Sequence, residues 1–124
     1  MNVIIAGGRD ITDYDIVERA VAESGFDIVQ VVSGGAKGVD TLAVLYAQKH
    51  DKHLAVFMAD WDRPGRKAGP IRNGQMADYA DALIAIWDGK SKGTKNMIDQ
   101  ATAKGMPVYV HRIPENNTIE GFIK

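Results

Sequence analysis

The sequence predicts an α/β Rossmann-like three-layer sandwich built on a five-stranded parallel sheet. Three observations support this fold: five short apolar runs recur along the chain, segments with helical spacing separate them, and glycine-rich turns follow several of the runs. Short continuous runs rich in Val and Ile are typical of parallel strands buried on both faces. Because strand and helix alternate throughout, right-handed crossovers predict the strand order 3-2-1-4-5.

The apolar runs are the predicted strands, and they occupy residues 3–6, 28–32, 54–58, 82–87 and 107–111. The predicted helices occupy residues 13–24, 39–50, 71–79 and 94–104. Thr12 or Asp13 can cap the start of the first helix, and Gly25 and Gly105 stop the first and the fourth. Residues 113–124 are predicted to form a turn and a weakly specified terminal element.

Size and composition limit the classes of function. A chain of 124 residues predicts one domain over residues 1–124. Fifteen basic and sixteen acidic residues give a formal charge of -1, so we do not expect nucleic acid as a partner or association with a membrane. The absence of cysteine excludes disulfides and thiolate catalysis, and it favours a cytoplasmic location.

Glycine-rich loops follow the first, second and fourth predicted strands, at residues 7–10, 33–38 and 88–94. In this fold a ligand binds at the carboxyl ends of the strands, near the point where the strand order reverses. Glycine lets the backbone approach a ligand closely, and a helix that starts directly after such a loop directs free N–H groups at an anion. The alternative is that the glycines only make tight turns. Three converging loops favour a phosphate-bearing ligand.

The long loop before the third helix concentrates charge over residues 60–73. Arg63, Arg66 and Lys67 are either solvated or ligand contacts, and Arg72 is the stronger candidate because it begins the helix beside Asn73. Trp61 and Trp87 could each stack on a base. Because Trp87 ends the fourth predicted strand, we expect it to lie nearer the ligand than Trp61 does.

Several motifs are incomplete. The Gly89-Lys90-Ser91 segment lacks the first glycine of a P-loop, because Ile84 stands there, and residues 34–38 lack the spacing of a dinucleotide fingerprint. The three histidines form no metal-ligating pattern with carboxylates. We therefore expect neither a metal nor a cofactor.

Four segments resemble the SLOG superfamily, which joins the Lonely Guy type phosphoribohydrolases to the Rossmann domain of DNA-processing protein A. These are the Ala6-Gly7-Gly8-Arg9 turn, the segment Ser33 to Asp40, the pair Arg72-Asn73, and the Gly89 to Thr94 loop. The short form is similar to the branch related to YspA and YpsA. The resemblance implies a nucleotide or nucleotide-derived ligand, with its phosphate near Gly93 and Thr94 and at residues 33–38.

The resemblance and the loops together give one set of expected ligand-binding residues, at the ends of the first, second and fourth strands and at the start of the third helix. They are Gly7, Gly8, Arg9, Ser33, Gly34, Gly35, Lys37, Gly38, Arg72, Asn73, Asp88, Gly89, Ser91, Gly93, Thr94 and Asn96.

Three functions stay open. The first is a sensor or sequestering module, because Asn96 stands where the Lonely Guy enzymes carry a glutamate, and an amide cannot take a proton as a carboxylate does. The second is a nucleoside-monophosphate phosphoribohydrolase that uses Arg72 with Asp40 as catalytic residues to cleave an N-glycosidic bond. The third is binding of single-stranded DNA in the manner of DNA-processing protein A. The resemblance also implies a homodimer or higher homo-oligomer.

Overall fold

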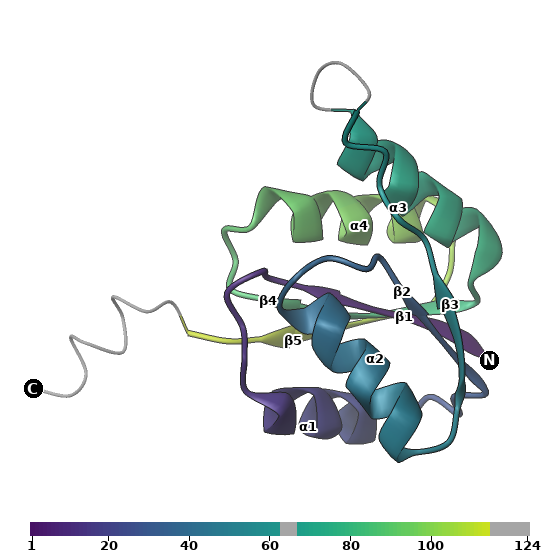
Figure 1. Cartoon of the computed structure of the whole chain (residues 1–124), viewed down its shortest axis with the longest axis vertical. Coiled ribbons are helices and arrows are strands. Elements are labelled where there is room, and N and C mark those ends of the chain that lie inside the picture. The colour runs from purple at the N-terminus through teal and green to yellow at the C-terminus, as the bar shows by residue number, and fades with distance from the viewer. Residues whose placement is uncertain (63–66, 115–124) are drawn as a thin grey trace, which may run out of the picture.

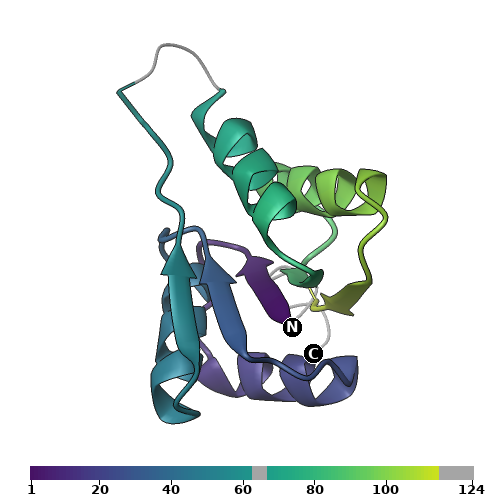
Figure 2. The same cartoon turned by 90° about the vertical axis from the view of Figure 1, so that its right-hand side faces the viewer.

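The protein is a three-layer α/β sandwich in the computed structural model, which describes residues 1–62 and 67–114. Five parallel strands lie in the order β3-β2-β1-β4-β5. Helices α1 and α2 cover one face of the sheet, and α3 and α4 cover the other (Figure 1, Figure 2). In chain order, the elements are β1 (Asn2–Gly7), α1 (Tyr14–Ser24), β2 (Gln30–Ser33), α2 (Val39–Lys49), β3 (His53–Val56), α3 (Ala68–Tyr79), β4 (Ala82–Trp87), α4 (Lys92–Ala103) and β5 (Val108–Arg112).

The central strands β1 and β4 divide the core into two halves. They pair in parallel from Val3 opposite Ala82 to Gly7 opposite Ile86. Val3 and Ile5 pack against α1 and α2, whereas Ile4 packs against α3 and α4. Alternate side chains of one apolar run therefore fill both layers, as expected of a strand buried on both faces.

The predicted strand order is confirmed, and the predicted start of α1 is also correct. Asp13 caps this helix by accepting a hydrogen bond from the Asp15 N–H at 3.0 Å. Gly25 ends it in the left-handed conformation, at φ 70°, which costs glycine nothing because it has no Cβ.

The edge strand β3 departs from the prediction that every strand is buried on both faces. Leu54 is 37% exposed and Val56 is 44% exposed. The predicted order already places β3 at an edge of the sheet, but an apolar run has the same appearance in a central strand and in an edge strand, so the local pattern did not show this exposure.

Some of the predicted features cannot be compared with the structure because their residues are not described. Residues 115–124 of the predicted terminal element lie outside the described residues, as do Arg63 and Arg66. Among residues 1–62 and 67–114, no helix has the length and apolar character needed to cross a membrane.

Candidate functional site

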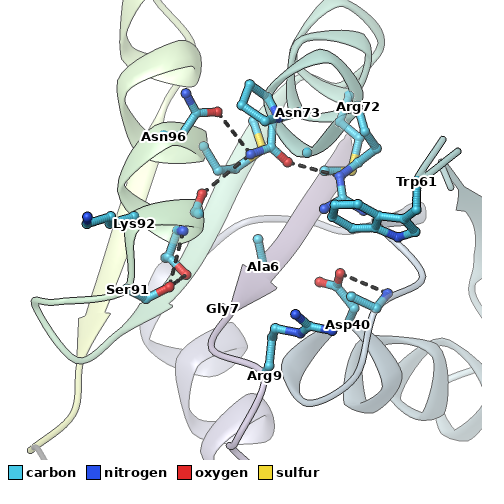
Figure 3. Close-up of a pocket in the computed structure, with 17 residues that line it drawn as sticks. Ala6, Gly7, Arg9, Asp40, Trp61, Arg72, Asn73, Ser91, Lys92 and Asn96 are labelled. Atoms are coloured by element: carbon cyan, nitrogen blue, oxygen red, sulfur yellow. Dashed lines mark hydrogen bonds between the residues drawn. The ribbon is translucent and has the colours of Figure 1, made fainter. Parts of the chain in front are cut away.

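A cavity of about 390 Å³ opens at the carboxyl end of β1, where the strand order reverses (Figure 3). The loops after β1, β2 and β4 line it together with α3, α4 and Trp61. Eight of the expected ligand-binding residues lie in its wall, as does the proposed catalytic Asp40. These are Gly7, Arg9, Arg72, Asn73, Ser91, Gly93, Thr94 and Asn96.

The remaining expected residues lie outside the cavity lining, and most of them shape the loops around it. They are Gly8, Ser33, Gly34, Gly35, Lys37, Gly38, Asp88 and Gly89.

The β2–α2 loop uses much of its own hydrogen-bonding capacity. The Gly35 N–H donates to Ser33 Oγ at 3.2 Å, the Ala36 N–H donates to Asp40 Oδ2 at 3.1 Å, and the Val39 N–H donates to the Gly8 carbonyl at 3.1 Å. Ser33 is fully buried and donates to the Asp40 carbonyl. This loop therefore brings Ala36 and Asp40 to the cavity rather than the row of free amides that its glycines suggested.

The N-terminus of α4 forms one wall of the cavity. Ser91 caps the helix, since its Oγ accepts a hydrogen bond from the Thr94 N–H at 3.4 Å. Within the described part of the chain, the first-turn N–H groups of Lys92 and Gly93 have no acceptor. Free amides at the positive end of a helix dipole attract anions. The Lys92 side chain points away from the cavity (Figure 3), so its backbone is what this residue contributes.

Asp88 sets the geometry of the β4–α4 loop from outside the cavity. Its Oδ1 accepts the N–H groups of Lys90 at 2.8 Å and Ser91 at 2.9 Å. These backbone hydrogen bonds hold the pKa of the Asp88 carboxyl below its usual value. The carboxylate therefore stabilises the turn that precedes α4, which is a role different from the expected ligand contact.

Arg72 and Asp40 lie close together on either side of Gly34. The Arg72 Nη1 donates to the Gly34 carbonyl at 2.5 Å, and its Nε donates to Asn73 Oδ1 at 3.0 Å. Burial raises the pKa of Asp40, and the Ala36 N–H and the Arg72 charge oppose this rise. A Cβ at position 34 would stand 2.8 Å from both the Arg72 Cζ and the Asp40 Oδ2. Glycine at this position leaves the room that the two charged groups occupy.

Asn96 joins α4 to α3. Its Oδ1 accepts hydrogen bonds from Asn73 Nδ2 at 3.0 Å and from Gln100 Nε2 at 2.9 Å. Gln100 also donates to the Pro70 carbonyl at 2.8 Å. The Asn96 side-chain oxygen is therefore engaged within the protein.

Trp61, and not Trp87, is the aromatic residue at the cavity. Trp61 lies in the wall and is 67% exposed. Trp87 instead donates its Nε1–H to the Ser91 carbonyl at 3.1 Å, and the Arg112 guanidinium lies over its ring. The position of Trp87 at a strand end suggested a ligand contact, but its side chain supports the loop. Lys67 is exposed and does not line the cavity.

Seven lining residues were not among the expected ligand-binding residues. Ala6, Ala36 and Lys92 lie inside segments that the sequence linked to a ligand, whereas nothing in the sequence linked the α3 and α4 residues Gly69, Pro70, Met76 and Met97 to one. Among the described residues, no group of three His, Cys, Asp or Glu side chains could hold a metal ion.

Solved structures share this fold. DNA processing protein A from Streptococcus pneumoniae aligns with a TM-score of 0.72 and 19% identity, over 88% of this chain and 49% of that one. This chain therefore spans about half the length of the streptococcal protein. The protein of the same name from Helicobacter pylori, described by its single-stranded DNA binding mode, aligns with a TM-score of 0.64 and 22% identity, over 99% of this chain and 72% of that one.

The second likeness corrects one expectation. Net charge led us to expect no nucleic-acid partner, and that expectation is wrong, because a protein with this fold is described as binding single-stranded DNA. A formal charge of -1 describes the whole surface and gives no information about a local site.

Sequence comparison identifies the family. The chain is 34% identical to the Gene 61 protein of Mycobacterium phage D29 in an alignment over 116 residues that covers 86% of this chain and 92% of the phage protein. Residues 1–63 match the family described as YAcAr: YspA, cpYpsA-related SLOG family. That segment includes the loops after β1 and β2. The chain belongs to the YspA, cpYpsA-related SLOG family.

Proposed function

We propose that this chain binds a nucleotide or nucleotide-derived phosphate ligand in the cavity, as a sensor or sequestering module. Its family and fold support a nucleotide- or nucleic-acid-binding module. The observation that carries the proposal is the capped N-terminus of α4 in the cavity wall, where the N–H groups of Lys92 and Gly93 have no acceptor among the described residues. The phosphate binds there in this proposal.

The other walls complement the rest of such a ligand. Arg9 adds a second positive group, and its side chain lies beside Asp40 (Figure 3). The apolar surfaces of Pro70, Met76 and Trp61 suit a base, which an aromatic ring can stack on. A volume of about 390 Å³ falls within the range of small-molecule sites, roughly 300–1,000 Å³.

The position of Asn96 favours binding without strong catalysis. Its Oδ1 already accepts two hydrogen bonds, and an amide cannot serve as a general base. A role as sensor or sequestering module needs affinity alone, which the helix N-terminus and the apolar walls supply.

A phosphoribohydrolase is the second candidate, and one observation favours it. Asp40 lies in the cavity wall as a carboxylate, close to Arg72. Asp40 would then replace the missing glutamate in stabilising the positive charge that develops on the sugar when the N-glycosidic bond breaks.

Single-stranded DNA is the third candidate, because Trp61 is 67% exposed at the cavity and exposed aromatic residues stack on unpaired bases. Affinity for an oligonucleotide that falls steeply between low and moderate salt, and that Trp61→Ala weakens, would support it.

One experiment separates these candidates. The protein is incubated with nucleoside monophosphates, NAD and ADP-ribose, and thermal shift and release of free base are both recorded. A sensor gives a thermal shift without turnover, whereas an enzyme releases base, and Arg72→Ala abolishes that release. The homo-oligomer and the single domain stay predictions, which light scattering and limited proteolysis test.

A further inference from the structure

Asp40 is a buried carboxylate with one oxygen left for a ligand. The residue is only 6% exposed, and its Oδ2 accepts the Ala36 N–H. Within the described part of the chain, Oδ1 has no hydrogen-bond partner. Figure 3 shows this second oxygen turned into the cavity. Among the described residues, no fully buried side-chain oxygen lacks a partner, so Oδ1 is accessible from the cavity, where a ligand that brings a donor can bond to it.

The neighbouring Arg72 does not satisfy that oxygen. Its Nη1 and Nε donate to Gly34 and Asn73, and among the described residues no hydrogen bond joins Arg72 to Asp40. Burial raises the pKa of Asp40, while the Ala36 N–H and the Arg72 charge oppose this rise. A carboxyl group keeps acceptor capacity in either protonation state. The cavity therefore presents an acceptor at this point.

The order of groups along the wall indicates which part of a nucleotide supplies the donor. In Figure 3, Asp40 lies between the Arg9 side chain and the Trp61 ring, and all three line the same cavity. Arg9 suits a phosphate and Trp61 suits a base. In a nucleotide, the sugar joins these two parts, and its hydroxyls are the donors that come with it.

We propose that Asp40 accepts a hydrogen bond from a ribose hydroxyl of the bound nucleotide, which makes the cavity selective for ribonucleotides over their deoxy analogues. This inference rests on the proposed nucleotide-binding function. The bond is assisted by the charge of the carboxylate, and such bonds are the stronger class in proteins. A deoxy analogue brings no donor to this oxygen, and a site that hydrogen-bonds a ligand hydroxyl discriminates against the analogue that lacks it.

The test compares matched ligands on the wild-type protein by calorimetry. Adenosine and guanosine 5′-monophosphates are measured against their 2′-deoxy and 3′-deoxy forms. We expect at least one deoxy form to bind about tenfold or more weakly than its ribonucleotide. The position of the missing hydroxyl identifies the donor. This comparison needs no variant, so it stands whether or not substitutions at position 40 fold.

Asp40→Asn tests the assignment to this residue. The amide oxygen can keep the Ala36 N–H bond, which leaves an NH₂ group facing the cavity where the free oxygen was. We expect the preference for the ribonucleotide to fall to about threefold or less, while the deoxy form binds at least as tightly as it does to wild type. Asp99→Asn is the matched control, because Asp99 is exposed on α4, pairs with Lys95 and does not line the cavity.

The two proposals fail in different ways. Equal binding of the ribonucleotide and both deoxy forms to the wild-type protein overturns the role of Asp40 and leaves the nucleotide site intact. A full preference retained in Asp40→Asn also overturns it. Failure of every nucleotide to bind overturns the proposed function, and the role of Asp40 with it.

Discussion

The Val39 N–H donates a hydrogen bond to the Gly8 carbonyl at 3.1 Å, so the first turn of α2 is tied to the loop after β1. The contact requires the two loops to approach closely at Gly38, where a Cβ would collide with the Gly8 and Arg9 carbonyls. Two glycine-rich loops that suggested a shared ligand thus contact each other directly. The open amides lie on the opposite side of the cavity, at α4.

Gly38→Ala should destabilise the protein more than Gly105→Ala does. Both glycines have positive φ, 74° and 77°, a backbone conformation that strains alanine by roughly 1–3 kcal/mol at either position. Only the Gly38 substitution also meets backbone atoms, because a Cβ at Gly105 has nothing within 4 Å. Denaturant unfolding should show a loss at least about 1 kcal/mol larger for Gly38→Ala. Equal losses would mean that the loops can separate without cost.

Gly93→Ala should change the free energy of unfolding and the affinity for the nucleotide in opposite directions. A Cβ at this position has nothing within 4 Å, and alanine is favoured over glycine within a helix by roughly 0.5–1 kcal/mol. We expect a small gain in the free energy of unfolding together with weaker nucleotide binding, because the added methyl group stands beside the free amides. Calorimetry and denaturant unfolding on the same variant check both effects. Unchanged affinity would place the phosphate elsewhere.

Asp88→Asn should have an effect that depends on pH. Hydrogen bonds from the Lys90 and Ser91 amides lower the pKa of Asp88 below 3.8 in the folded protein. A carboxyl with a depressed pKa stabilises the fold above its unfolded pKa and loses that contribution as the pH falls through the folded value. The variant should therefore be less stable than wild type at pH 7 by under about 1 kcal/mol, since solvent reaches this partly exposed carboxyl and screens it. At pH 3 the difference should be smaller, and a difference that grows in acid would contradict this.

Arg72→Ala should destabilise the protein even without ligand. It removes the hydrogen bonds to Gly34 and Asn73 and the positive charge beside the buried Asp40. We expect a loss of about 2 kcal/mol in urea unfolding. Arg19→Ala, at an exposed residue of α1, is the control and should change stability by about 0.5 kcal/mol or less. Equal effects of the two variants would show that Arg72 has no structural role.

The fold was largely predictable because each strand is a local apolar run and strand and helix alternate strictly. The predicted strand order placed β3 at an edge, but the apolar pattern of Leu54 and Val56 suggested core residues, and both are exposed. Burial there depends on which strands lie beside it, and no local pattern encodes that.

The sequence predicted the part of the candidate site in which backbone amides at a helix start can bind an anion, as at Ser91, Gly93 and Thr94. It did not predict which side chains point into the cavity. Trp87 ends β4 and Trp61 lies in the loop after β3, but only Trp61 reaches the cavity. Asp40 was expected as a substitute catalytic group, whereas its free oxygen and its place between Arg9 and Trp61 became visible only in three dimensions.

The most direct test of the central claim is a nuclear magnetic resonance titration of ¹⁵N-labelled protein with adenosine or guanosine 5′-monophosphate, beside the unphosphorylated nucleoside. If the N-terminus of α4 holds the phosphate, the backbone amides of Lys92 and Gly93 shift strongly with the monophosphate and little with the nucleoside, and Arg9→Ala reduces the response while Lys95→Ala does not. Shifts that are the same with and without the phosphate, or that leave these two amides unchanged, would contradict the account.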